Sequence, residues 1–259
     1  MAVIAANGET LAYVDEGAGP EVLFIHSLGT NAWLWRDQIT VLNEHYRCIA
    51  FDCRGHGDSS YNGTFTIPDV AADLKAGLEA LGIASCHVVG LSMGGPIALY
   101  LNARYPGVVR SLVLADAFAT PREGAEDRIY ATQEAVAYLS MLEFGNQYAG
   151  DRLLPTTPIE KLEELAIEIA KVPAKAYVDT VRAIFTFDAS GTLAKVDVPT
   201  LVLIGDQDQA TPMADSEFIR QAITGAELKV IPDAGHLTTI DNPDAVTEEI
   251  AEFLDARMR

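Results

Sequence analysis

The sequence is short of cysteine and of long apolar runs. Its three cysteines, Cys48, Cys53 and Cys86, are odd in number and scattered, and their spacing matches no zinc motif. We therefore expect no disulfide framework and no metal site, and we expect all three thiols to act as small buried hydrophobic groups. No stretch approaches the roughly 20 apolar residues that a membrane-spanning helix needs.

Positive charge is also scarce, with 18 Lys and Arg against 37 Asp and Glu, for a formal net charge of −19. Such a field repels nucleic acid and anionic membranes, so we expect neither as a partner. An anionic substrate would need a local cluster of Arg or Lys. The first ten residues carry neither a basic region nor an apolar run, so we expect no signal peptide and a cytoplasmic location.

Short apolar runs alternate with amphipathic segments along the 259 residues. This pattern predicts an α/β fold, with a mostly parallel central sheet flanked by helices. A hairpin is expected at the N-terminus, with its turn at Asn7-Gly8. The expected parallel strands lie at residues 22–26, 47–52, 87–90, 111–116, 200–205 and 227–231.

Three helix starts stand out. Capping boxes are expected at residues 66–69 and 157–160, and Asn242-Pro243 is expected to begin a C-terminal helix. Residues 118–191 contain helical patterns without a convincing strand. We therefore predict a helical cap there, inserted into a core domain formed by residues 1–117 and 192–259. Such a cap could cover the carboxyl ends of the strands.

The sequence Gly90-Leu91-Ser92-Met93-Gly94 lies between an expected strand and an expected helix. A Gly-x-Ser-x-Gly motif in this setting is a nucleophile elbow, which exposes the serine hydroxyl on a sharp turn. The alternative is a glycine-rich structural turn. We favour Ser92 as a nucleophile.

A serine hydroxyl needs a base, and His236 is the only one of the five histidines that follows Ser92. In this fold the acid lies between the two in the chain, so Asp208, just after the strand at 200–205, is the preferred acid. Asp206 and Asp116 are its rivals. The oxyanion hole is expected to use the backbone N–H groups of Leu28 and Met93.

Two further loops with polar side chains are expected to have structural and not catalytic roles. We expect His26 to be a hydrogen-bonding residue and not a second base. We expect Arg54, His56 and Asp58 to brace the turn in which they lie, which lacks the spacing and the lysine of a phosphate-binding loop.

Taken together, these motifs resemble the α/β-hydrolase superfamily of serine hydrolases. A narrower resemblance is to 3-oxoadipate enol-lactone hydrolases of aromatic catabolism. It rests on Ser27-Leu28-Gly29-Thr30 with Trp35 and Gln38, Arg54-Gly55-His56-Gly57, Leu91-Ser92-Met93-Gly94-Gly95, and Asp208-Gln209-Ala210-Thr211-Pro212. The sequence departs from those enzymes at His26, where they often carry Asn.

The resemblance implies hydrolysis of a small ester or lactone through an acyl-enzyme, without a metal or organic cofactor. Alternatives are a carbon–carbon bond hydrolase of ring-cleavage products, a general carboxylesterase, or a ligand receptor with slow turnover. We expect a monomer or a homodimer. Candidate substrate contacts are Trp33, Arg128, Met213 and Leu237. If the substrate is a carboxylate, at least one cap arginine should line the pocket, among Arg122, Arg128, Arg152 and Arg182.

Overall fold

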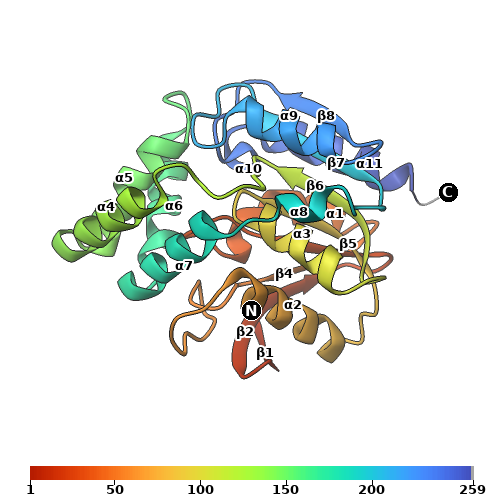
Figure 1. The fold of residues 1–259 in the computed structure, drawn as a ribbon, viewed down its shortest axis with the longest axis horizontal. Helices are drawn as coiled ribbons and strands as arrows, with labels where there is room; N and C mark the ends of the chain where they lie inside the picture. The colour runs from red at the N-terminus through yellow and green to blue at the C-terminus, as the bar shows by residue number, and fades with distance from the viewer. Residues whose placement is uncertain (258–259) are drawn as a thin grey trace.

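The computed structural model describes residues 1–257, which build one mostly parallel sheet flanked by helices (Figure 1). Its eight strands lie in the order β1-β2-β4-β3-β5-β6-β7-β8, and only β1–β2 and β2–β4 pair antiparallel. This confirms the predicted fold class. The strands are β1 (Ala2–Ala6), β2 (Glu9–Glu16), β3 (Glu21–Ile25), β4 (Arg47–Phe51), β5 (Cys86–Leu91), β6 (Val109–Ala115), β7 (Thr200–Gly205) and β8 (Glu227–Ile231).

The strand ends differ from the prediction by one or two residues, except in β7 and β8. The strand expected to end at Asp116 ends at Ala115, because Asp116 adopts a left-handed backbone with φ of 47°. The N-terminal hairpin turns at Asn7 and Gly8, both with positive φ, as the sequence predicted.

Helices of the core pack in two groups. Helix α1 packs against α11, and α2 packs against α3. The core helices are η1 (Ala32–Trp35), α1 (Arg36–Leu42), α2 (Ile67–Ala80), α3 (Gly94–Arg104), α9 (Met213–Ala222), α10 (Thr238–Asp241) and α11 (Pro243–Asp255). Among residues 1–257, no helix is both long enough and apolar enough to cross a membrane.

We call residues 118–191 the cap segment. Its helices all lie between β6 and β7, and α4–α7 protrude together beyond one end of the sheet (Figure 1). They are α4 (Ala125–Tyr138), α5 (Met141–Arg152), α6 (Ile159–Ala170), α7 (Ala174–Thr186) and α8 (Ser190–Leu193). Helix α8 packs against α3 and so returns the chain to the core.

The capping predictions had mixed outcomes. The box at Thr66 forms as expected, whereas the box expected at Thr157 is wrong. Helix α6 begins at Ile159, and the Thr157 hydroxyl donates to the Asp241 carboxylate of the core. A capping box that the sequence analysis missed, Ser140 with Glu143, begins α5.

Buried thiols support the structural interpretation of the cysteines. All three are buried and free. Burial raises the pKa of the Cys48 and Cys86 thiols to about 12 and raises that of Cys53 as well. Because the thiolate is the reactive form, these groups are poor nucleophiles at neutral pH.

Candidate active site

Ser92 lies on the turn between β5 and α3 with a backbone φ of 52°, a conformation that residues with a side chain rarely adopt. Close packing of the flanking glycines holds this turn. A Cβ atom on Gly90 would lie 2.4 Å from the Gly94 carbonyl oxygen, and one on Gly94 would lie 2.4 Å from that of Ile25. Only glycine fits both positions, and the result is the strand–turn–helix arrangement of a nucleophile elbow.

Three predicted residues meet at the carboxyl ends of the strands. Nε2 of His236 lies 2.9 Å from Ser92 Oγ, and Nδ1 of the same ring lies 2.9 Å from Asp208 Oδ2. All three side chains are buried. The backbone N–H of His236 donates to the Arg152 carbonyl at the end of α5, so the cap segment also holds this loop.

The Asp208 carboxylate is held by several donors besides the imidazole. Its Oδ1 accepts the backbone N–H groups of Ala210 and Thr211, and its Oδ2 accepts the Thr211 hydroxyl at 2.5 Å. Burial raises the pKa of Asp208, but the hydrogen bonds from His236 and Thr211 outweigh it and lower the pKa below its ordinary value. The carboxylate therefore stays ionised beside the imidazole. No pattern in the sequence had indicated this role of Thr211.

The two rival acids bond elsewhere. Asp116 accepts the Gly205 N–H at 2.9 Å and the Thr238 hydroxyl at 2.6 Å. Burial, together with the nearby Asp208 charge, raises the pKa of Asp116 well above its ordinary value. Asp206 accepts the backbone N–H of Ala234, as expected of a residue that braces the loop.

The two predicted oxyanion donors come from the elbow itself and from the loop after β3. Met93 directly follows Ser92, and Leu28 lines the same cavity as Ser92. Within residues 1–257, neither backbone N–H donates to another backbone carbonyl. Both groups are therefore free to receive an oxygen from a substrate.

His26 takes the structural position that the sequence analysis expected. Its Nε2 accepts the Cys53 backbone N–H at 2.9 Å, so Nδ1 carries the proton and donates to the Ser27 carbonyl at 2.8 Å. Burial, with His56 nearby, lowers the pKa of His26 to about 3, which keeps the ring neutral. Arg54 likewise braces its turn through two hydrogen bonds to Asp73.

A cavity of about 40 Å³, which we call the Ser92 cavity, adjoins Ser92 and His236. A second space of about 420 Å³ lies between α4, α5 and α7 and shares lining residues with it, so the two spaces adjoin. The Ser92 cavity is lined by Leu28, Ser92, Phe118, Arg122, Arg128, Tyr148, Arg152, Ile184, Phe185, Ala210, Thr211 and His236.

Three of the four cap arginines line this cavity. Arg122 is paired with Asp215 at 2.6 Å. Arg128 and Arg152 pair with no carboxylate among residues 1–257; each lies over an aromatic ring, Phe185 and Tyr148 respectively. Two unpaired positive charges therefore border a cavity in a strongly acidic protein.

The other candidate substrate contacts lie elsewhere. Trp33 lines a separate cavity beside α1, where the Arg36 guanidinium covers its ring. Leu237 is fully buried in the core, and Met213 begins α9 outside the residues that line the Ser92 cavity. The fourth arginine, Arg182, does not line the Ser92 cavity either.

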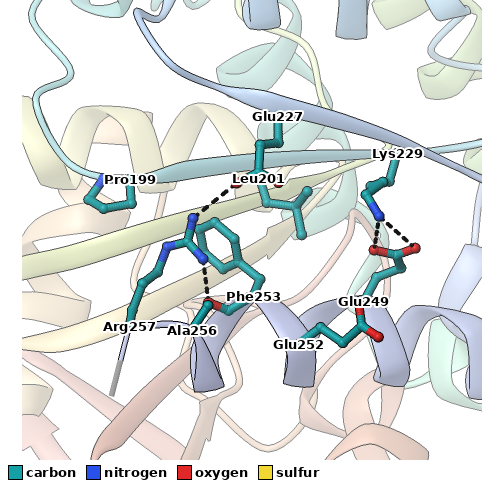
Figure 2. A pocket seen from close by; sticks show the side chains of 9 residues that line it. All are labelled: Pro199, Leu201, Glu227, Lys229, Glu249, Glu252, Phe253, Ala256 and Arg257. Carbon is teal, nitrogen blue, oxygen red and sulfur yellow. Dashed lines mark hydrogen bonds and ion pairs between the residues drawn. The ribbon is translucent and has the colours of Figure 1, made fainter. Parts of the chain in front are cut away.

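A further cavity of about 400 Å³ lies between β8 and α11 (Figure 2). Four of its five charged side chains form ion pairs, Lys229 with Glu249 and Arg257 with Glu227. Ser92, Asp208 and His236 do not line it. Within residues 1–257, His, Cys, Asp and Glu side chains form no group that could hold a metal ion.

Comparisons with known proteins agree with this architecture. A family model for the alpha/beta hydrolase fold matches residues 20–243. The 3-oxoadipate enol-lactonase 1 of Acinetobacter baylyi is 31% identical over 261 residues, which cover 96% of this chain and 94% of that protein.

Two solved structures are similarly close. The enol-lactonase from Burkholderia xenovorans LB400 superposes with a TM-score of 0.92 at 26% identity, covering 98% of this chain and 100% of its own. A thermophilic esterase from Thermogutta terrifontis reaches 0.93 at 27% identity, covering 99% of each chain. The chain belongs to the α/β-hydrolase fold family and resembles the enol-lactonases within it.

Proposed function

We propose that this protein hydrolyses a small carboxylic ester or lactone through an acyl-enzyme formed on Ser92. The observation that carries the proposal is the unbroken hydrogen-bonded series from Ser92 through His236 to Asp208, at 2.9 Å for both steps. A serine with a base in hydrogen-bonding reach, and a base oriented by a third group, is the arrangement that activates a hydroxyl nucleophile.

In the first half-reaction, Ser92 Oγ attacks the substrate carbonyl carbon while His236 Nε2 accepts the hydroxyl proton. The carbonyl oxygen becomes an oxyanion that the Leu28 and Met93 N–H groups can stabilise. The carbon–oxygen bond to the leaving group then breaks, and His236 returns the proton to that oxygen. In a lactone, this oxygen stays attached to the acyl chain.

In the second half-reaction, water attacks the acyl carbon while His236 accepts a proton from it. Collapse of the oxyanion releases the carboxylic acid, and the proton returns to Ser92 Oγ. The ionised Asp208 stabilises the imidazolium that forms twice in the cycle. Every step uses side chains already in place, and none requires a metal or cofactor.

We also propose that the substrate carries a free carboxylate, as the substrate of 3-oxoadipate enol-lactonases does. Arg128 and Arg152 support this, because both line the Ser92 cavity without an ion-pair partner among the described residues. Arginine suits this role since its planar guanidinium can donate to both carboxylate oxygens. Phe118, Ile184 and Phe185 supply the apolar wall of the cavity.

Fluorophosphonate labelling followed by peptide mapping tests the nucleophile. We expect a single adduct on Ser92. In Ser92→Ala, labelling should vanish and ester turnover should fall by at least about 10⁴-fold. Ser216→Ala is the matched control, because this buried serine hydroxyl has no hydrogen-bond partner within residues 1–257. An adduct on another serine, or retained turnover in Ser92→Ala, would contradict the proposal.

A further inference from the structure

The loop after β3, residues 27–31, carries the proposed oxyanion donor Leu28, and the core holds its first peptide. The Ser27 carbonyl accepts the His26 Nδ1–H at 2.8 Å and the Thr30 hydroxyl at 2.9 Å. The peptide is trans, so its N–H, which belongs to Leu28, points away from the Ser27 carbonyl. These core bonds therefore aim the Leu28 N–H away from His26 and Thr30.

The next peptide of the loop is held from the cap segment. Tyr148, on α5, donates its hydroxyl to the Leu28 carbonyl at 3.2 Å. The two peptide planes that flank the Leu28 Cα are thus fixed by different parts of the molecule, one by the core and one by the cap. Together they set the backbone dihedrals of Leu28 and the direction of its N–H.

Two more cap helices contact the same loop. Glu168, on α6, accepts a hydrogen bond from the Asn31 side chain at 2.7 Å. The Tyr177 ring, on α7, packs so closely against Gly29 that a Cβ atom there would lie 2.8 Å from the ring. Gly29 also has a positive φ of 77°. Each of α5, α6 and α7 thus contributes at least one contact to a loop of five residues.

We propose that Tyr148 is a positioning residue, which holds the Leu28 carbonyl and thereby sets the Leu28 N–H for the oxyanion. The cap segment then has a part in the chemical step in addition to shaping the cavity. This inference rests on the proposed function, because it concerns the oxyanion of the Ser92 reaction. Burial raises the pKa of the Tyr148 phenol, so its hydroxyl remains a donor throughout the neutral pH range.

The variant Tyr148→Phe tests the proposal, since it removes the hydroxyl and keeps the ring. With p-nitrophenyl acetate as substrate, we expect kcat per labelled Ser92 to fall about tenfold, less than the 10²–10³ for a deleted oxyanion donor. KM should stay within about twofold, because the carbonyl gains its charge only in the transition state. The inhibition constant of a trifluoromethyl ketone, which forms an oxyanion adduct, should rise by the same factor as kcat falls.

Tyr61→Phe is the matched control. The Tyr61 hydroxyl also joins core to cap, through Asp179 on α7, but it lies outside the loop of residues 27–31. We expect its kcat to stay unchanged. Counting active sites by fluorophosphonate labelling removes any misfolded fraction from the comparison.

The possible outcomes separate the two proposals. If wild-type Ser92 is not labelled, the proposed function fails. If it is labelled and Tyr148→Phe retains full kcat and inhibitor affinity, the positioning role alone is overturned. A rise in KM without a fall in kcat would instead make Tyr148 a substrate contact and would equally overturn it.

Discussion

The two sides of the Ser92 cavity are built differently. On the core side, Ser92, His236 and Asp208 bond to one another and to backbone groups. On the cap side, Arg128 and Arg152 reach the same cavity without an ion-pair partner among the described residues. On the core side the polar side chains already have hydrogen-bond partners, whereas on the cap side two positive charges remain available to a ligand. We infer that the core determines the reaction and the cap determines the substrate.

The largest effect on catalysis is expected from a substitution on the core side of the cavity. Asp208→Asn keeps the shape of the residue but replaces the carboxylate that orients the His236 imidazole. We expect kcat to fall about 10⁴-fold, with the fold intact by circular dichroism. Asp206→Asn is the control, because its retained amide oxygen can still accept the Ala234 N–H. If Asp208→Asn and Asp206→Asn lost kcat equally, Asp208 would not be the acid that orients His236.

An intermediate effect is expected on the cap side. Arg128→Gln and Arg152→Gln should each raise KM for mono-p-nitrophenyl glutarate about 10- to 100-fold, because a charge-assisted hydrogen bond is worth about 1.5–3 kcal/mol. KM for the neutral p-nitrophenyl butyrate should hardly change. Arg182→Gln, outside the cavity, serves as the control. Equal effects on both esters would show that these arginines do not select for charge, and would favour a general carboxylesterase.

The smallest effect concerns stability and tests whether the core acids have separate roles. The pKa of Asp116 is raised in the folded protein, so the folded state binds this proton more tightly than the unfolded chain does. The resulting contribution is fully present below the unfolded pKa of about 3.9 and is lost as the pH rises through the folded pKa.

Asp116→Asn should therefore lose less stability than the wild type between pH 4 and neutral pH, as measured by urea unfolding. Its ester turnover should change far less than that of Asp208→Asn. An unchanged pH profile would mean that Asp116 is ionised in both states. A collapse of turnover with normal stability would instead make Asp116 the working acid.

The fold and the core side of the site were readable from sequence because local rules determine them. A parallel sheet brings the ends of its strands to one edge, so Ser92, Asp208 and His236 could be brought together from their places after strands. The φ of Ser92 and the close packing of its glycines follow from the same motif. The local motif around Ser92 and the arrangement of the strand ends in the sheet thus lead to the same site.

The cap side was less readable because its contacts depend on helix packing across distant segments. Nothing near Thr157 indicated that its hydroxyl would bond to Asp241, 84 residues away, in place of capping α6. Tyr148 was missed for the same reason, since its carbonyl partner at Leu28 is 120 residues distant. The amphipathic pattern of a helix gives its buried face but not the element it packs against.

The bonds between cap and core also bear on making chimeras. His236 donates its backbone N–H to Arg152, and Asp241 accepts the Leu154 N–H, so the crossover between α5 and α6 holds the histidine loop. A chimera that takes residues 118–191 from a relative would keep these two backbone groups only if its crossover follows the same path, and it would replace the Thr157 hydroxyl that also donates to Asp241. Residue 241 should therefore be exchanged together with the segment, so that the side chain at position 157 keeps its acceptor and the loop that carries His236 keeps its position.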